Sequence, residues 1–576
     1  MKVSSFIAKF LFENEVRHVF ELSGGMITHI LDSIHNEGKI DIITMHHEQS
    51  ASFAADAYGR IKRVPGVALA TSGPGATNLI TGIGSCYFDS SPAVFITGQV
   101  NVHEQKGDKK IRQLGFQETD IVSMVKPITK ATFKVEAAED IPSIFSNAFK
   151  IALEGRPGPV LVDIPMNIQR MDIDIQDHQI KKIVANTESF TLNDEIFDLL
   201  EKDIISSKFP MILAGRGISA SASENNLLKF AEKFNIPIIS TLLGLDIVPY
   251  DHYLRAGFIG SYGNRWANLS IGTCDLIIVI GSRLDIRQTG ADVDSFQKDK
   301  KIYHIDCDFN EINNRLKNCI PIVSDCGIFL EKALKYYEDK NFIRNHDWIN
   351  SINVLKNRWK DTDEVKDIPG INPNHLIHVL SKNSKNATCF LSDVGSHQMW
   401  TAQSIELLSN QRFLTSGGMG AMGFALPAAI GACFAFNKKP VVAIIGDGSF
   451  QLNIQELQTI VRNKLPVKIV VINNQSLGMI RQFQDSYFDG RHQSTVLGYD
   501  TPDFEKVAKA YGIKSATVTD AKSLQKAIDK IWLELDTPFL LQVMVDKNAN
   551  AYPKIAFGKP ITEMEPFSSP IDMEGT

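Results

Sequence analysis

The chain has 576 residues, of which 44% are apolar and 22% are charged, and its net charge is −6. This balance is typical of a globular protein and gives no reason to expect binding to nucleic acid or to a membrane. No apolar run reaches the ~20 residues that cross a bilayer, and charged residues interrupt any signal-like core near the N-terminus, so we expect a cytoplasmic protein. The seven cysteines include no Cys-x-x-Cys, which predicts free thiols.

Strand and helix patterns alternate along the whole chain, which predicts an α/β fold built from doubly wound parallel sheets. We expect three such domains, at residues 1–172, 190–342 and 368–550, followed by a tail at 551–576. The pattern loses its regularity between 173 and 193 and becomes polar, as in a linker.

In the first domain, strands are expected at 18–22, 40–44, 66–71, 93–97 and 160–164. The segment 46–50 follows a strand and opens an alanine-rich helix, so Glu48 could be no more than a favourable charge at a helix N-terminus. The segment 72–78 is typical of a turn that enters a helix. Phe116 could be an ordinary core aromatic residue.

In the central domain, strands are expected at 210–213, 236–240, 276–280, 302–305 and 320–323, and a helix at 327–337. Polar or glycine-rich loops follow three of these strands, at 214–217, 281–287 and 304–306. Loops at the carboxyl ends of neighbouring parallel strands form the crevice where nucleotides bind. A Rossmann-like domain that has lost its ligand is the alternative.

In the third domain, strands are expected at 389–391, 441–445, 467–472 and 539–545. Asp447 and Asn474 lie 27 positions apart, and the residues between them predict a turn, a helix opening at Ser449 and a buried strand. Both polar side chains should then lie at one edge of a parallel sheet. With the Ser476 carbonyl they would suit Mg²⁺, and the helix N-terminus would suit phosphate. An ordinary glycine turn is the alternative.

This arrangement resembles the diphosphate-anchoring motif of thiamine diphosphate enzymes. Further segments, at 393–400, 415–424 and 477–484, resemble the catalytic subunits of acetohydroxyacid (acetolactate) synthases. The resemblance implies that Met422 holds thiamine diphosphate in a bent conformation and that His397 contacts its diphosphate. The cofactor contacts implied in this domain are His397, Gly420, Met422, Gly446, Gly448, Ser449 and Met479.

In the first domain, the segments 47–49 and 54–58 resemble the family stretch that carries the catalytic glutamate. Glu48 is therefore expected to relay a proton to the pyrimidine ring of the cofactor, with its pKa tuned by burial. The stretch 116–120 also matches the synthases, and Phe116 and Gln117 are expected to face the bound intermediate.

The loops of the central domain resemble the FAD contacts of the same synthases. The residues implied are Gly215, Arg216, Gly217, Arg283, Asp285, Arg287 and Asp306. Arg283 has a further expected role, because its guanidinium group could pair with the carboxylate of an acceptor 2-oxoacid.

Three departures from the family bear on the acceptor substrate. Met166 stands where the synthases have a lysine, and Phe483 stands where they have a tryptophan. The loop 101–115 is longer than expected and is basic, with Lys106, Lys109, Lys110 and Arg112. Such a loop is either a solvated surface or a binding site for the phosphates of a larger acceptor.

The function that we expect is an acetolactate synthase-like carboligation, with pyruvate as donor and a second 2-oxoacid as acceptor. One alternative transfers the two-carbon unit to a nucleotide-linked keto-sugar. A pyruvate oxidase-like redox enzyme and a non-catalytic thiamine diphosphate-binding protein are the others. The resemblance further implies a homodimer or homotetramer, whereas the sequence leaves a regulatory subunit undecided.

Overall fold

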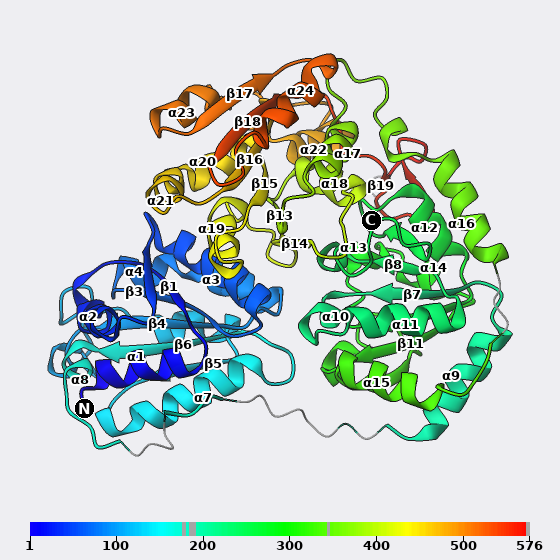
Figure 1. The fold of residues 1–576 in the computed structure, drawn as a ribbon. Coiled ribbons are helices and arrows are strands. Elements are labelled where there is room, and N and C mark those ends of the chain that lie inside the picture. Colours follow the sequence, from blue (N-terminus) through cyan, green and yellow to red (C-terminus); the bar gives the residue numbers. More distant parts are fainter. Residues whose placement is uncertain (176–179, 184–189, 191, 343–345, 572–576) are drawn as a thin grey trace.

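The computed structural model describes residues 1–175, 180–183, 190, 192–342 and 346–571. Three six-stranded parallel sheets, each flanked by helices, confirm the predicted α/β fold. The three units lie in a triangle, with the first and the third joined on the left of Figure 1 and the central unit on the right. The expected domain limits remain predictions. Parts of the predicted linker and tail, including 184–189 and 572–576, lie outside the described residues.

The first sheet has the strand order β2-β1-β3-β4-β6-β5. Its strands are β1 (His18–Leu22), β2 (Asp41–Thr44), β3 (Gly66–Ala70), β4 (Ala93–Gln99), β5 (Ala131–Lys134) and β6 (Pro159–Pro165). Its helices are α1 (Val3–Glu13), α2 (Thr28–Glu37), α3 (Glu48–Lys62), α4 (Pro74–Asn78), α5 (Ile80–Phe88), α6 (Ile121–Val125), α7 (Ile141–Leu153) and α8 (Met166–Gln169).

The central sheet has the order β9-β8-β7-β10-β11-β12. In chain order this is 3-2-1-4-5-6, the arrangement that binds dinucleotides between its first and fourth strands. The strands are β7 (Pro210–Ala214), β8 (Ile238–Ser240), β9 (Arg255–Phe258), β10 (Leu276–Ile280), β11 (Lys301–Asp306) and β12 (Ile320–Val323). The helices are α9 (Asp194–Ser206), α10 (Arg216–Ala220), α11 (Glu224–Phe234), α12 (Arg265–Thr273), α13 (Ile286–Thr289), α14 (Val293–Gln297), α15 (Cys326–Tyr336) and α16 (Asp347–Arg358).

The third sheet, β14-β13-β15-β16-β18-β17, repeats the topology of the first. Its strands are β13 (Cys389–Ser392), β14 (Arg412–Thr415), β15 (Val441–Gly446), β16 (Val467–Asn473), β17 (Lys514–Val518) and β18 (Phe539–Met544). Its helices are α17 (Pro373–Asn383), α18 (Ser396–Ser404), α19 (Ala425–Ala435), α20 (Asp447–Leu452), α21 (Leu457–Arg462), α22 (Gly478–Tyr487), α23 (Phe504–Ala510) and α24 (Ala521–Ile531). The tail carries the antiparallel pair β19 (Lys554–Ile555) and β20 (Met564–Glu565).

Two local predictions were wrong. The helix after β15 begins at Asp447, with Gly446 as its cap, and not at Ser449. The helical run from 449 to 461 is broken at Asn453 into α20, a short 3-10 turn and α21. The prediction also missed four strands: β5, β9, β14 and β17.

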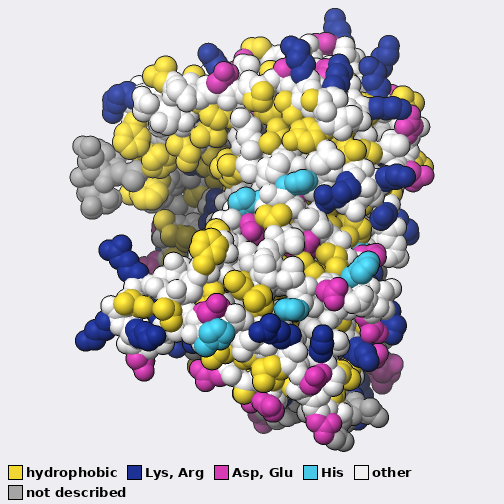
Figure 2. All heavy atoms as spheres, turned by 90° about the vertical axis from the view of Figure 1, so that its left-hand side faces the viewer, with side chains coloured by type: hydrophobic (Ala, Val, Ile, Leu, Met, Phe, Trp, Pro, Cys, Tyr) yellow, Lys and Arg dark blue, Asp and Glu magenta, His cyan; other side chains and the backbone are white. Residues whose placement is uncertain are grey.

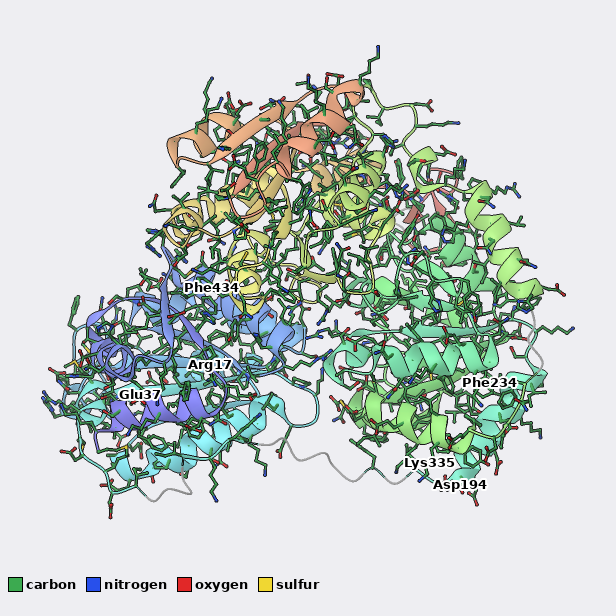
Figure 3. All side chains as sticks on the ribbon, viewed as in Figure 1. Arg17, Glu37, Asp194, Phe234, Lys335 and Phe434 are labelled. Atoms are coloured by element: carbon green, nitrogen blue, oxygen red, sulfur yellow. The ribbon has the colours of Figure 1, made fainter. Side chains whose placement is uncertain are left out.

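The first and third units of the chain meet through α3 and α19, which lie side by side (Figure 1). The helices approach closely because a Cβ atom at Gly431 would lie 2.1 Å from the Ala54 carbonyl oxygen. At the end of α19, the ring of Phe434 packs 4.9 Å from that of His18 and 6.3 Å from that of Phe20 (Figure 3). The contact is therefore apolar and tightly packed.

The cysteines are all free, as predicted, and six of the seven are buried. In the described part of the chain, no helix has the length and apolar character needed to cross a membrane.

Candidate cofactor and active site

Asp447 and Asn474 lie at the carboxyl ends of neighbouring strands, because Gly446 of β15 pairs with Ile472 of β16. Asp447 Oδ1 accepts a 2.9 Å hydrogen bond from the Gly448 N–H, and Asn474 Oδ1 accepts one of 3.2 Å from the Ser476 N–H. Burial raises the pKa of Asp447 to about 7, although nearby backbone N–H groups favour its ionised form. A divalent cation would stabilise the ionised carboxylate further.

The other side of this site comes from the start of α18. The strand order reverses between β13 and β15, and the crevice at such a point is where ligands bind in open α/β sheets. The His397 ring lies against Gly446, where a Cβ atom would be 2.5 Å from His397 Nδ1. Burial lowers the pKa of His397 to about 3, so that the ring is neutral at pH 7. Only glycine fits at position 446 beside this ring.

Several buried polar atoms around these strand ends have no hydrogen-bond partner within the described part of the chain. They are Ser396 Oγ, His397 Nε2, Asp447 Oδ2, Ser476 Oγ and Tyr499 Oη. Buried polar atoms are normally satisfied, so a group of unsatisfied ones at one place points to a polar ligand. Among the described residues, no three His, Cys, Asp or Glu side chains form a group that could hold a metal ion. One carboxylate, one amide and a backbone carbonyl, however, are ligands suited to Mg²⁺.

Asp393, which the prediction did not single out, holds the segment that carries Met422. Its carboxylate accepts hydrogen bonds from the N–H groups of Gly423, at 2.9 Å, and Ala425, at 2.7 Å. Met422 is half-buried, and its methyl carbon would lie 3.5 Å from a Cβ atom at Gly448. Met422 therefore lies beside the Asp447 turn.

The remaining contacts predicted in this unit fall around the same strand ends. Ser449 is buried and donates a 2.9 Å hydrogen bond from Oγ to the Val394 carbonyl. Gly420 has a left-handed φ of 64° and open space around it, and Met479 is half-buried in the first turn of α22.

Glu48 is the first residue of α3 and is buried. The helix is capped by His47, whose Nδ1 accepts a 3.0 Å hydrogen bond from the Gln49 N–H. Glu48 Oε2 accepts a 2.9 Å hydrogen bond from Asn78 Nδ2. Glu48 Oε1 lies beside Gly75, where a Cβ atom would be 3.2 Å away. The carboxylate is thus held between α3 and α4, the helix that follows the turn at Gly73.

The stretch after the basic loop lies against the same turn. Gln117 has a left-handed φ of 66°, and its Cβ would be 2.9 Å from a Cβ atom at Gly73. Phe116 is 80% exposed, so the alternative that it is a core aromatic residue is wrong. An aromatic side chain this exposed is available to a substrate or to a second copy of the chain.

The start of α3 is also tied to the third unit. Asn453, at the end of α20, accepts a 3.0 Å hydrogen bond from Ser50 Oγ and donates one of 2.7 Å to the Gly423 carbonyl. No hydrogen bond in the described part of the chain joins Glu48 to Asp447 or Asn474. The structure therefore holds the two groups on separate elements.

A cavity of about 580 Å³ opens at the junction of all three units. The loops after β7 and β10 line it, and six of the predicted FAD contacts lie on its wall: Arg216, Gly217, Arg283, Asp285, Arg287 and Asp306. Gly215, the seventh, is not among the lining residues and packs instead against the Gly281 carbonyl. Burial raises the pKa of Asp306 to about 6, and Arg216 Nε is buried without a partner.

Arg283 is half-buried in this cavity and pairs with Asp285 at 3.2 Å. In the described chain, Arg283 therefore contacts residues of the central unit. It does not contact Glu48 or Phe116, the residues beside which it was predicted to bind the acceptor.

The basic loop 101–115 is exposed and is closed on the carboxylate of Glu118. Glu118 accepts hydrogen bonds from the N–H groups of Lys106, at 2.6 Å, and Leu114, at 2.8 Å. The cationic side chains of the loop have no ion pair among the described residues. Phe483 is 40% exposed and packs with Tyr487, ring to ring, at 4.6 Å.

Family models match all three units of the chain. The N-terminal thiamine pyrophosphate (TPP) binding domain of thiamine pyrophosphate enzymes matches residues 1–124. The central domain of these enzymes matches 199–333, and their C-terminal TPP binding domain matches 393–543. The chain belongs to the thiamine pyrophosphate enzyme family.

Curated relatives cover almost the whole chain. The acetolactate synthase large subunit of Lactococcus lactis subsp. lactis (strain IL1403) is 37% identical over 564 residues, which are 97% of this chain and 95% of that protein. The probable acetolactate synthase large subunit of Methanococcus aeolicus is 37% identical, over 94% of this chain and 91% of its own. The acetolactate synthase isozyme 2 large subunit of Escherichia coli (strain K12) is 36% identical, over 95% and 96%. The chain is thus a thiamine diphosphate-dependent enzyme, as predicted.

Proposed function

We propose that this enzyme decarboxylates pyruvate and joins the two-carbon unit to a second 2-oxoacid, as an acetolactate synthase does. The observation that carries the proposal is the group of unsatisfied buried polar atoms at the switch point between β13 and β15, in a chain similar throughout to acetolactate synthase large subunits. We keep a cytoplasmic location as a prediction from the sequence.

The residues at this switch point suit the diphosphate and its metal. Asp447, Asn474 and the Ser476 carbonyl would hold Mg²⁺, and Ser396 and His397 would contact phosphate oxygens. Met422 would support the bend of the cofactor, because Asp393 fixes its segment. When bound, thiamine diphosphate supplies the electron sink for loss of CO₂.

Glu48 would exchange a proton with the pyrimidine ring, and Asn78 would keep its carboxylate in place. Gln117 and Phe116 would border the reacting carbon, since both adjoin the turn at Gly73 next to Glu48.

An assembly of two or four copies would complete the site. Glu48 and Asp447 lie on separate elements, and Phe116 is left exposed. Figure 2 shows apolar side chains gathered on one face over the third unit, and contiguous apolar surface of this kind marks interaction sites. A second copy covering this face would bring the first unit of one chain to the third unit of the other.

FAD is the second cofactor that we propose, and the strand order 3-2-1-4-5-6 supports it. The cavity at the switch point between β7 and β10 offers Arg216, Arg283 and Arg287 to the phosphates. Arg216 Nε is buried and unsatisfied, which fits a missing anionic partner. The pairing of Arg283 with an acceptor carboxylate stays a prediction from the sequence.

One observation favours a second acceptor, a nucleotide-linked keto-sugar. The four cations of the loop 101–115 have no acidic partners in the described chain, and Glu118 holds the loop beside Phe116 and Gln117. Phosphates of a larger acceptor would pair with these cations.

The test is incubation of the purified enzyme with pyruvate, thiamine diphosphate and Mg²⁺. We expect acetolactate to form and CO₂ to be released in step, and Glu48→Gln to lower the rate by about 10² to 10⁴. Release of CO₂ without acetolactate would reject a 2-oxoacid acceptor and favour the nucleotide sugar. Turnover that requires oxygen or a quinone would favour a pyruvate oxidase-like enzyme instead.

A further inference from the structure

A second cavity, of about 340 Å³, lies between the central and third units, away from both proposed cofactor sites. Three parts of the chain form its wall: β9 and the residues before it, α16 with the turn that follows, and the helices α17 and α18. In Figure 1, α17 and α18 lie side by side near the top centre, and α16 lies at the right-hand edge. The residues on the wall include Tyr250, Arg255, Lys356, Lys360, Asp361, His375, His378, Lys382, Gln403 and Glu406.

Two cations share one aromatic ring inside this cavity. The Arg255 guanidinium lies 4.8 Å from the centre of the Tyr250 ring, and Lys356 Nζ lies 5.2 Å from it. Within the described chain, neither side chain makes an ion pair or a hydrogen bond. Burial lowers the pKa of both groups, and the charges of Asp361 and Glu406 offset this only in part.

The two carboxylates of the cavity are already engaged by other groups. Asp361 Oδ2 accepts hydrogen bonds from His378 Nε2, at 2.8 Å, and Ser404 Oγ, at 2.6 Å. Glu406 Oε1 accepts from His378 Nδ1 at 2.7 Å and pairs with Lys382 at 3.2 Å. Burial opposes protonation of His378, but its two carboxylate partners outweigh this and raise its pKa to about 9. The ring is therefore charged at pH 7.

The charges in the cavity are therefore unequal. Five cationic groups, which are Arg255, Lys356, Lys360, His378 and Lys382, face the two carboxylates. A purely structural cation–π contact would explain one cation on the Tyr250 ring. It would explain neither the second cation nor the hydrogen-bond donors of the Arg255 guanidinium group. A guanidinium with free donors on the wall of a cavity, next to a lysine, is the arrangement that binds phosphate.

We propose that this cavity is a binding site for a phosphate group, either inorganic phosphate or the phosphate of a small metabolite. Arg255 contributes the paired donors, Lys356 and Lys360 contribute charge, and the ring of Tyr250 holds Arg255 and Lys356 in place. Because the wall comes from the central unit, which includes α16, and from the third unit, the bound anion would join these two units.

The experiment measures binding of inorganic phosphate to the full-length protein by titration calorimetry. Thiamine diphosphate and Mg²⁺ are present in excess so that phosphate does not enter the diphosphate site, and sodium chloride keeps the ionic strength constant. We expect saturable binding that Arg255→Gln weakens at least tenfold and that Lys360→Gln, a change on the exposed rim, weakens about threefold. Adenosine 5′-diphosphate, titrated in parallel, separates the two sources of phosphate: tighter binding than phosphate that Arg255→Gln also weakens identifies a metabolite, and equal or weaker binding identifies the free ion.

Two control variants make the result specific. Lys526→Gln removes an exposed lysine of α24 that does not line the cavity, and it should leave phosphate binding unchanged. Arg287→Gln removes a cation from the larger cavity. Phosphate binding that persists in Arg255→Gln and Lys360→Gln, or that is lost only in Arg287→Gln, would overturn the proposal. If Arg255→Gln does not fold, Lys356→Gln and Lys360→Gln carry the same test.

Discussion

The residues of the candidate site differ in how far the sequence could predict them. The sequence could predict Asp447 and Asn474, because each follows or ends a buried strand and a parallel sheet brings such strand ends together. Asn78 was not predicted, because it reaches Glu48 across the fold with no periodic signal. Asp393 was missed as well, although it directly follows β13. Residues that act through contacts distant in sequence can be identified only from the structure.

Asn78 is predicted to act as a positioning residue for Glu48. Asn78→Ala removes the 2.9 Å hydrogen bond to the buried carboxylate and should slow turnover about 10- to 100-fold, since hydrogen bonds to charged groups contribute about 1.5–3 kcal/mol. The measurement is exchange of the C2 proton of bound thiamine diphosphate for deuterium, together with the affinity for the cofactor. Thr77→Ala, on the neighbouring turn, is the control. An exchange rate equal to that of the wild type would contradict the positioning role.

His378 is predicted to make stability depend on pH. Its pKa in the folded protein, about 9, lies above the ordinary value of 6.5, so its contribution is full below pH 6.5 and is lost as the pH rises through about 9. The shift corresponds to at most about 3 kcal/mol. Thermal unfolding of the wild type and of His378→Gln should therefore differ at pH 6 and converge near pH 10. The exposed His375→Gln, on the same helix, should follow the wild type at every pH.

Among the elements, the strands that the prediction missed share a physical cause. β5, β9, β14 and β17 are four or five residues long, and all four are edge strands of their sheets. In β17 only Val518 is buried, so the continuous apolar run that marks an inner strand is absent. The break of the helix at Asn453 was missed for another reason: the Asn453 side chain bonds to Ser50 and Gly423, which a local pattern does not contain.

The packing of α3 on α19 yields a prediction at this scale. Gly431→Ala places a methyl group 2.1 Å from the Ala54 carbonyl oxygen, so the helices must move apart. Overpacking of this kind outweighs the gain in helix propensity, and we expect a net loss of about 1–2 kcal/mol. Differential scanning calorimetry measures it as a lower Tm. The matched control is Gly25→Ala, which meets open space and should leave the Tm nearly unchanged.

For the whole molecule, binding of the cofactor and folding are predicted to be linked. Thiamine diphosphate and Mg²⁺ at 100 times the dissociation constant should add about 2.7 kcal/mol of stability, because the ligand binds the folded state. The measurement is the Tm with and without both ligands, and with EDTA, which should cancel the gain. Asp447→Ala should lose the response, whereas Asp536→Ala, at an exposed position, should keep it. An equal rise in Tm for both variants would place the metal elsewhere.

The unsatisfied polar atoms at the ends of β13, β15 and β16 bear on the abundance of the protein in the cell. A cofactor that binds these atoms stabilises the folded state, so the chain is least stable before its cofactor arrives. Chaperones and proteases act on the unfolded fraction, and a loss of 1–2 kcal/mol changes the abundance of a protein several-fold. The supply of the vitamin thiamine would then set how much of this enzyme survives in the cell, as well as how much of it is active.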